Sequence, residues 1–320
     1  MILAAGLGTR LLPLTHVRPK VMIPVLGTPI LDFWAERLRQ CKFEAAILNA
    51  YHLKERVVEE VAQKTWPIAI EVHTEPMLLG TGGGIRTALE SLGDDPFAVI
   101  NGDIVCNAPI DRLYEEHVRS GAEVSLLLHD WPEFNNVAVD EEGSVLGFGK
   151  EAQRIRAGRN GVRMLAFTGI HFINPAALRE YPRGAPADIL DFYRRLISCG
   201  SPPRALFSPG LFWREMGSLE SYRKLTSELG GLEENILPPI VTGRRVWIHP
   251  EATVSPGTEL KGSVVIGRGT KILDGSRLED VILWEDVRIE AASSLKGCIA
   301  ADGTAISGRH SGKVFVPGRK

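Results

Sequence analysis

The sequence is poor in cysteine, and the spacing of its cysteines excludes the usual cysteine-based frameworks. Its 320 residues include four cysteines, which are Cys41, Cys106, Cys199 and Cys298. No two of them form a CxxC pair. Scattered single thiols argue against a structural zinc site and against a disulfide scaffold. We expect all four to be buried and reduced, which is typical of a cytoplasmic protein.

The sequence also lacks an excess of charge of either sign and any long apolar run. Its net charge is −2, which provides no basic surface for nucleic acid. No apolar run approaches the roughly 18 residues that cross a bilayer. No basic segment precedes the apolar N-terminus, as a signal peptide requires. We therefore expect a cytoplasmic protein with no nucleic-acid partner and no membrane partner.

What the chain does contain is a short apolar run followed by a glycine-rich turn. Residues 1–5 predict a buried strand, and the next residues include Gly6, Gly8 and Arg10, with Lys20 further on. Backbone N–H groups of such a turn form an anion site, and the two cations add charge for phosphate. The turn lacks the Gly-Lys-Ser/Thr of a P-loop and the third glycine of the dinucleotide fingerprint. On these residues alone it fits either a phosphate loop or an ordinary strand-to-helix turn.

Up to about residue 130, strand-like runs alternate with helical patterns. The expected strands are 1–5, 45–50, 68–75, 97–101 and 122–129. The expected helices lie near 29–41, 53–64, 82–92 and 110–120, the first with Thr28 as N-cap and Pro29 as its first residue. This alternation predicts a Rossmann-like α/β domain, a mostly parallel sheet with helices on both faces, in which ligands bind at the carboxyl ends of strands. Further on we expect a hairpin at 136–150, helix over 175–199 and extended chain over 204–214.

Past residue 240 the hydrophobic period changes to six. Large apolar residues recur at this spacing at Ile248, Val254, Leu260, Ile266, Ile272 and Leu278. After a one-residue slip, the pattern resumes at Leu283, Ile289 and Leu295. A six-residue repeat predicts a parallel β-helix of about four coils, each burying its face on the next. We therefore expect a domain over residues 1–240 followed by a short β-helix domain over 241–320.

Five ordered segments carry a resemblance to a known family. They are Gly6-x-Gly8-Thr9-Arg10 with Pro19-Lys20, Glu75-Pro76 with 79–84, Asn101-Gly102-Asp103, Phe167-Thr168-Gly169-Ile170, and 213–217. Together they closely resemble the signature of sugar-1-phosphate nucleotidyltransferases, or NDP-sugar pyrophosphorylases, over about residues 1–230. The six-residue repeat resembles hexapeptide-repeat proteins, which implies that the β-helix is left-handed, whereas the usual crossover rule favours the right hand.

The family resemblance implies a set of site residues. Nucleotide binding is assigned to Leu3, Ala4, Ala5, Gly6, Gly8, Thr9, Gly80, Thr81, Gly82, Gly83 and Asp103. Arg10, Lys20 and Asp103 are expected to be catalytic: Arg10 neutralises the departing pyrophosphate, Lys20 bridges phosphates and Asp103 binds Mg²⁺. Lys150, Thr168 and Gly169 are expected to bind the sugar phosphate.

Two of these segments also carry a signal of their own. A carboxylate such as Asp103, just after a strand, suits Mg²⁺, although a turn Asp that caps a helix shows the same pattern. Three successive glycines at 82–84 are costly in a helix, which indicates that something flat lies against that backbone. A flexible loop is the alternative for this segment.

Two positions depart from the family pattern. Glu215 stands where the family has its second metal-binding Asp, so the negative charge is kept and one methylene is added. We still expect Glu215 to hold Mg²⁺, directly or through water. Gly149 stands where the family has a Glu that binds sugar hydroxyls, with Glu151 as the nearest carboxylate. These departures limit any assignment of the sugar.

The implied reaction is attack of a sugar-1-phosphate oxygen on the α-phosphorus of a nucleoside triphosphate, with Mg²⁺ as cofactor and pyrophosphate as leaving group. A phosphate dianion needs no strong general base, so positioning and charge neutralisation carry the catalysis. A short β-helix after the catalytic domain resembles mannose-1-phosphate guanylyltransferases. The segment 167–171 also resembles N-acetylmuramate-1-phosphate uridylyltransferases.

Three other functions stay open. They are the same chemistry on another alcohol phosphate, such as phosphocholine; a regulatory homologue without activity; and acyl transfer by the β-helix, where His249 has no evident partner. We expect the repeats to support homo-oligomer formation and stability rather than chemistry. Because relatives usually carry a few residues before the first strand, we also expect the natural start to lie upstream of Met1, or the strand to fray.

Overall fold

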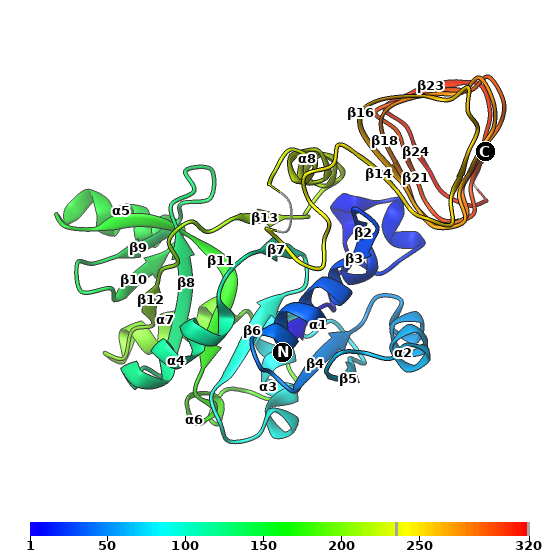
Figure 1. The fold of residues 1–320 in the computed structure, drawn as a ribbon. Coiled ribbons are helices and arrows are strands. Elements are labelled where there is room, and N and C mark those ends of the chain that lie inside the picture. Colours follow the sequence, from blue (N-terminus) through cyan, green and yellow to red (C-terminus); the bar gives the residue numbers. More distant parts are fainter. Residues whose placement is uncertain (234–235, 319–320) are drawn as a thin grey trace. The chain divides into compact units, whose positions relative to one another are not determined.

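A computed structural model describes residues 1–233 and 236–318 (Figure 1). The chain forms two compact units, each built from two stretches of sequence. The sheet unit comprises Met1–Gly6 and Leu38–Trp213, and the repeat unit comprises Leu7–Arg37 and Arg214–Lys320. The expected domain boundary near residue 240 stays a prediction.

The sheet unit is built on a mixed sheet with the strand order β10-β9-β11-β6-β1-β4-β5, in which β8 pairs with β11 and β12. The strands of this sheet are β1 (Ile2–Leu3), β4 (Ala45–Ala50), β5 (Ala69–Thr74), β6 (Phe97–Asn101), β8 (Val124–His129), β9 (Val137–Val139), β10 (Val145–Phe148), β11 (Arg163–Ile173) and β12 (Arg204–Leu206). β5, β4, β1 and β6 are parallel, and β11 runs antiparallel to β6. The carboxyl ends of the four parallel strands therefore meet at one edge.

Helices cover both faces of this sheet. The helices of the chain are α1 (Ile30–Gln40), α2 (Lys54–Gln63), α3 (Gly80–Leu92), α4 (Ile110–Ser120), α5 (Lys150–Gly158), α6 (Pro175–Leu178), α7 (Ile189–Ser198) and α8 (Leu219–Gly230). Consecutive residues of β11 point to opposite faces: the His171 ring bonds Tyr193 of α7, whereas Phe172 stacks on His117 of α4. The predicted α/β architecture is confirmed.

Several expected elements differ in detail. The first helix begins at Ile30, and Thr28–Pro29 forms a short strand β3 with β2 (Pro24–Val25), so the predicted N-cap is wrong. Residues 179–188 are not helical, which divides the helix expected over 175–199 into α6 and α7. Two N-cap side chains start these pieces: Asn174 accepts from Ala176 N and Asp188 from Leu190 N. The expected hairpin is confirmed as β9 and β10.

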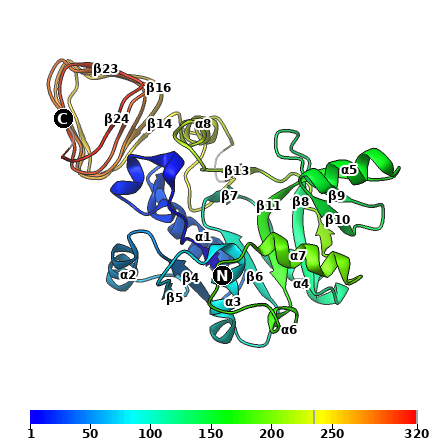
Figure 2. The same ribbon diagram turned by 180° about the vertical axis from the view of Figure 1, so that it is seen from behind.

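The repeat unit contains stacked coils of short parallel strands (Figures 1 and 2). The strands are β14 (Val246–Ile248), β15 (Thr253–Val254), β16 (Glu259–Ile266), β17 (Lys271–Ile272), β18 (Arg277–Leu283), β19 (Arg288–Ile289), β20 (Ser294–Lys296), β21 (Ile299–Ala300), β22 (Ala305–Ile306), β23 (Arg309–Ser311) and β24 (Val314–Phe315). Ile266 and Leu283 pair in register within the core, so the six-residue pattern lines it there, whereas Ile248 of the first coil pairs with Ile266 but is exposed. This arrangement is consistent with the expected β-helix, whose hand stays a prediction.

The one-residue slip in the repeat has a local structural cause. Along the β16–β18 ladder, Lys261 pairs with Glu279 but Val264 pairs with Val281, so the second coil is one residue shorter. Asp280 absorbs the difference in a left-handed conformation with φ 53°. Its Oδ1 accepts a hydrogen bond from Ser263 N at 2.9 Å, which satisfies a ladder donor that would otherwise lose its partner.

The cysteines follow the prediction in part. Cys41, Cys106 and Cys298 are buried, whereas Cys199 is exposed because it follows the last turn of α7. The expectation that all four are buried is therefore wrong for Cys199. Within residues 1–233 and 236–318, no helix combines the length and the apolar character that a membrane span needs.

A buried histidine should make stability fall with acid. His117 lies between α4 and the sheet, where its Nδ1 is 2.8 Å from Ser125 Oγ, and burial lowers the pKa of its imidazole to about 4. Between that pKa and about 6.5, the unfolded chain binds a proton that the folded chain excludes, so unfolding is favoured as pH falls. From pH 7 to pH 5 we expect the free energy of unfolding to drop by about 2 kcal/mol more in wild type than in His117→Gln, measured by urea denaturation. Equal drops would contradict this assignment.

Candidate active site

The turn after β1 is tied to the start of α3 by buried side chains within the sheet unit. Ala4 N donates to Asn49 Oδ1 at 2.8 Å, and Asn49 Nδ2 donates to Glu75 Oε1 at 2.7 Å. The other oxygen of Glu75 accepts from Leu79 N at 3.0 Å. Both side chains are buried, so each would be costly to leave unpaired. This chain of hydrogen bonds fixes the backbone of residues 3–6 relative to the start of α3.

The glycines at the start of α3 are buried against another segment of the protein. A Cβ on Gly83 would lie 2.5 Å from Ala185 O, and one on Gly82 would lie 3.0 Å from Ile189 N. Gly82 N also donates to Ala187 O at 2.9 Å. The flat partner indicated by the sequence is therefore, at these two positions, the backbone of 185–189. The alternative of a flexible loop is wrong.

Thr81 is likewise occupied within the protein. Its Oγ1 donates to Asp188 Oδ1 at 3.2 Å and accepts from Ile189 N at 3.0 Å. The hydroxyl thus helps to start α7. What the segment 80–83 can present to a ligand is mainly backbone, because the hydroxyl and the Cβ directions of Gly82 and Gly83 face the protein.

Asp103 lies at the carboxyl edge of the parallel strands, in the turn between β6 and β7 (Ile104–Cys106). Its neighbour Gly102 donates from N to Leu3 O at 2.8 Å, and a Cβ on Gly102 would lie 2.6 Å from the same oxygen. Only glycine allows this approach. The backbone next to Asp103, a half-buried residue, is therefore held beside the end of β1, where the sequence predicts a phosphate turn.

Thr168 and Gly169 form an irregularity in β11. The pairing with β8 shifts between Phe167 and His171, and Gly169 adopts φ 82°. Thr168 Oγ1 donates to Leu127 O at 2.8 Å, while Thr168 O accepts from Trp213 Nε1 at 2.8 Å. The threonine side chain is fully committed and buried, so this segment offers its backbone rather than its hydroxyl.

The departure at Gly149 has a backbone cause. Gly149 adopts φ 59° and ψ −127° just before α5, a region that essentially only glycine populates. A glutamate at this position would be strained, so the family's sugar-binding Glu has no place in this local structure. Lys150, the first residue of α5, is exposed. The stem of Glu151 packs over Gly147, with Cγ 3.2 Å from the Cβ position of that glycine.

In the repeat unit, a hydroxyl supports the glycine-rich turn. Thr15 Oγ1 donates to Gly8 O at 3.1 Å, and Leu11 N donates to the same oxygen at 2.9 Å. A Cβ on Gly8 would lie 2.6 Å from the methyl group of Thr15. The following residues form a short 3₁₀ helix η1 (Thr9–Leu11), in which Thr9 and Arg10 are exposed. Lys20 begins another, η3 (Lys20–Met22), and is half-buried.

Arg10 and Glu215 come together around Gly217 in the same unit. A Cβ on Gly217 would lie 2.7 Å from Glu215 Oε1 and 3.0 Å from Arg10 Nη2. Glu215 ends β13 (Trp213–Glu215) and is half-buried. The glycine of the segment 213–217 thus leaves room for the guanidinium of Arg10, from the glycine-rich turn, and for the carboxylate of Glu215.

The structure also identifies residues that sequence reasoning left out of the site. Asn49 and Glu75 position the turn after β1, although neither was predicted as a site residue. Glu75 was part of a matched segment, and a carboxylate before a proline is not itself a signal for a buried acceptor. Asn49 is the last residue but one of an apolar strand, where a lone polar residue in a buried position indicates a hydrogen-bonding role.

The carboxylates of the predicted site suit Mg²⁺ better than they suit a metal ion whose ligands all come from the protein. Among the residues that the structure describes, no three His, Cys, Asp or Glu side chains cluster in a way that could hold a metal ion. Mg²⁺ usually takes one or two carboxylates and completes its shell with water and substrate phosphates. Asp103 in the sheet unit and Glu215 in the repeat unit are donors of this kind.

Comparisons with known proteins identify the family. Residues 1–230 match the family described as Nucleotidyl transferase, and residues 242–311 match the GMPPB C-terminal domain. The chain therefore belongs to the nucleotidyl transferase family. Its curated relatives are sugar-1-phosphate nucleotidyltransferases, so the predicted family and enzyme class are confirmed.

The similarity to individual relatives is distant. Mannose-1-phosphate guanylyltransferase of Mycobacterium tuberculosis is 30% identical over 307 residues, which cover 93% of this chain and 82% of that protein. N-acetylmuramate alpha-1-phosphate uridylyltransferase of Caulobacter vibrioides is 30% identical over 247 residues, or 71% and 94% of the two chains. A solved structure of HddC from Yersinia pseudotuberculosis, complexed with GMP-PN, matches with a TM-score of 0.59 at 23% identity. It covers 71% of this chain and 97% of that one, and it shows the fold alone.

Proposed function

We propose that this protein transfers a guanylyl group from GTP to mannose-1-phosphate, giving GDP-mannose and pyrophosphate in the presence of Mg²⁺. The observation that carries the proposal is the 30% identity to a mannose-1-phosphate guanylyltransferase across 93% of the chain, the repeat region included. The match of residues 242–311 to the GMPPB C-terminal domain points the same way. The altered sugar contact at Gly149 is the reason why the sugar must be tested.

In the proposed reaction, an oxygen of the sugar phosphate forms a bond to the α-phosphorus while the bond from that phosphorus to the bridging oxygen of pyrophosphate breaks. The backbone of Gly6, Gly8 and Thr9 cradles the triphosphate. Arg10 neutralises the charge that develops on the leaving pyrophosphate. Lys20 bridges phosphate groups, and Lys150 holds the sugar phosphate.

We propose that Asp103 and Glu215 hold Mg²⁺, which when bound offsets negative charge on the phosphates. A different structural observation supports each of the two residues. Asp103 is fixed beside the end of β1 by the tight approach of Gly102 to Leu3 O. Glu215 lies next to Arg10 around Gly217, so the carboxylate faces the residues of the phosphate turn.

The remaining nucleotide contacts are proposed for backbone groups. Leu3, Ala4 and Ala5 precede the phosphate turn, which Asn49 holds in place through Ala4 N. The segment at Gly80, Thr81, Gly82 and Gly83 is proposed to contact the nucleobase and ribose. At Thr168 and Gly169 the backbone is proposed to lie on the sugar ring.

Glu215 provides a test of the metal assignment that uses small changes. Glu215→Asp restores the family's usual carboxylate, so we expect turnover to be preserved or raised. Glu215→Gln keeps the size and removes the charge, so we expect about tenfold lower turnover and a higher Mg²⁺ concentration for half-maximal rate. Turnover is read as pyrophosphate release during an Mg²⁺ titration. An unchanged Mg²⁺ requirement in Glu215→Gln would remove Glu215 from the metal site.

The substrates are tested by a matrix of nucleoside triphosphates against sugar-1-phosphates, read by pyrophosphate release. We expect GTP with mannose-1-phosphate to give the highest kcat/KM. Preference for another pair would keep the reaction class and replace the proposed substrates. Phosphocholine, as a non-sugar acceptor, belongs in the same matrix.

A second candidate is uridylyl transfer to N-acetylmuramate-1-phosphate. The relative with that activity is also 30% identical, over 71% of this chain. The segment 167–171 of this chain resembles such enzymes. UTP with N-acetylmuramate-1-phosphate is therefore the pair that most directly competes with the first proposal.

Four broader proposals accompany the reaction. They are a catalytic domain over 1–240 with a β-helix domain over 241–320, a homo-oligomer through the β-helix, a cytoplasmic location, and no nucleic-acid or membrane partner. The domain division is supported by family matches that end at 230 and begin at 242. Light scattering tests the oligomer.

A further inference from the structure

Between the two expected phosphate cations, Arg10 and Lys20, lies an arginine with a different environment. Arg18 is 7% exposed, whereas Arg10 is exposed. The segment that contains all three has little regular structure: three 3₁₀ turns, including η2 (Leu14–His16), replace any longer helix or strand. The backbone hydrogen bonds within this segment are local and span three or four residues, so the placement of one turn relative to the next depends on what the segment packs against.

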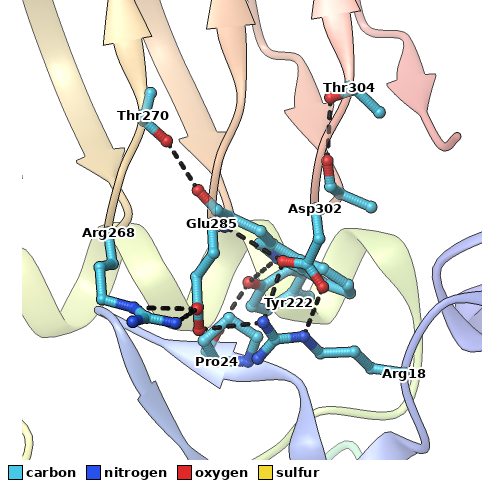
Figure 3. Close-up of polar contacts among 10 residues, drawn as sticks. Arg18, Pro24, Tyr222, Arg268, Thr270, Glu285, Asp302 and Thr304 are labelled. Atoms are coloured by element: carbon cyan, nitrogen blue, oxygen red, sulfur yellow. Dashed lines mark hydrogen bonds and ion pairs between the residues drawn. The ribbon is translucent and has the colours of Figure 1, made fainter.

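Arg18 is bonded to carboxylates of the repeat coils. Its Nε donates to Asp302 Oδ2 at 2.6 Å, and its Nη2 donates to Asp302 Oδ1 and Glu285 Oε1, both at 2.9 Å (Figure 3). The guanidinium also lies 5.6 Å from the ring centre of Trp284. A buried two-point contact of this kind fixes direction as well as distance.

A second contact holds the same segment beyond Lys20. Tyr222 of α8 donates from its hydroxyl to Pro24 O at 2.6 Å, and Trp284 Nε1 donates to that hydroxyl at 3.0 Å. Figure 3 shows Tyr222, Pro24 and Arg18 gathered at the same coils. Trp284 therefore takes part in both contacts. Lys20 lies in the sequence between two anchored points, Arg18 and Pro24.

An ion pair this buried is a poor way to gain stability alone. Desolvation of the charges offsets much of their attraction, and apolar residues of similar volume often stabilise a fold as well. What the pair provides is a defined placement of the arginine backbone. That placement matters most for a short irregular segment that also carries Arg10 and Lys20, the residues proposed to bind phosphate.

We propose that Arg18 is a positioning residue: through Asp302 and Glu285, the β-helix holds the segment from Gly8 to Pro24 in the shape that presents Arg10 and Lys20 to the triphosphate. This inference rests on the proposed nucleotidyl transfer. It departs from the expectation that the repeats contribute only to self-association and stability. A truncation near Thr242 would remove both partners of Arg18.

The chain offers a matched control. Arg268 bonds the same Glu285 carboxylate, at 2.8 Å, but its side chain is exposed and belongs to the coils themselves. Arg18→Met and Arg268→Met therefore remove the same charge from the same acceptor, and only the first releases the segment. Asp302→Asn is a milder release that keeps the size of the side chain, and it decides the matter if Arg18→Met does not fold.

The test combines hydrogen exchange with kinetics on the full chain. We expect Arg18→Met and Asp302→Asn to exchange faster than wild type in peptides covering 7–25, while Arg268→Met does not. We also expect kcat/KM for the triphosphate to fall by about tenfold or more, with the KM for the sugar phosphate unchanged. Arg18→Lys retains the charge but not the fork, and we expect it to recover part of the loss.

The outcomes are distinguishable. The inference would be overturned if hydrogen exchange at 7–25 were as slow as in wild type in both Arg18→Met and Asp302→Asn. It would also be overturned if the kinetic constants of these two variants equalled those of Arg268→Met. A uniform loss in which the sugar-phosphate KM rises with the triphosphate KM would show general damage and would also overturn it. If wild type itself has no turnover with any substrate pair, the proposed function fails, and the exchange comparison still decides whether Arg18 fixes the segment.

Discussion

Replacement of Asp103 by alanine is expected to lower turnover by about a thousandfold or more, since each 1.36 kcal/mol of lost transition-state stabilisation is worth about tenfold. Asp103 follows Gly102, whose tight approach to Leu3 holds the backbone of this turn at the carboxyl edge of the parallel strands. As a proposed metal ligand it acts on charge that develops during transfer, so kcat should fall more than substrate affinity. Pyrophosphate release under saturating substrates measures this.

The control for this variant is Asp94→Ala, which removes an exposed carboxylate that pairs only at the surface with Arg179. Asp94→Ala should keep wild-type turnover, and both variants should keep the wild-type circular dichroism spectrum. If Asp103→Ala is as active as wild type, the metal assignment is wrong while the family membership stands.

Replacement of Arg10 by alanine is expected to have the next largest effect, about a hundredfold or more in kcat. Arg10 is exposed in η1 and lies beside Glu215 around Gly217. The guanidinium is proposed to neutralise the departing pyrophosphate, an interaction that strengthens as the bond breaks. In the reverse reaction, the KM for pyrophosphate should therefore rise as well.

Arg112→Ala provides the matched control, because Arg112 is an exposed arginine on α4 in the sheet unit. It should leave both directions of the reaction unchanged. A loss in Arg10→Ala that appears only in the sugar-phosphate KM would contradict the role assigned to Arg10. It would move that cation to the acceptor phosphate.

The parts of the fold that could be predicted are those in which local pattern and tertiary burial agree. The strand at 45–50 is mostly apolar and is buried after Ala45, and its bounds are those expected from the sequence. The six-residue repeat lines a core of Ile266, Ile272 and Leu278, because each coil repeats the same contacts. Asp103 was expected at a strand end, and the turn between β6 and β7 places it there.

The parts that could not be predicted depend on contacts between distant segments. Thr28-Pro29 has the local signature of a helix start, but pairing with β2 takes these residues into a strand. The glycines of α3 indicate a close neighbour, yet only the fold identifies it as 185–189. Arg18 is one cation among several in its segment, and nothing local reveals two carboxylates more than 260 residues away in the sequence.

Nucleotidyl transfer by this protein is tested by following the α-phosphate of the nucleotide. Wild-type protein is incubated with Mg²⁺, mannose-1-phosphate and GTP labelled at the α-phosphate, and the products are separated. We expect the label to appear in a nucleotide sugar and unlabelled pyrophosphate to be released in equal amount. If the label stays in GTP with every acceptor tested, the protein has no nucleotidyl transfer activity and the regulatory alternative holds. If the label appears only in free GMP or GDP, the protein hydrolyses GTP and the proposed transfer is contradicted.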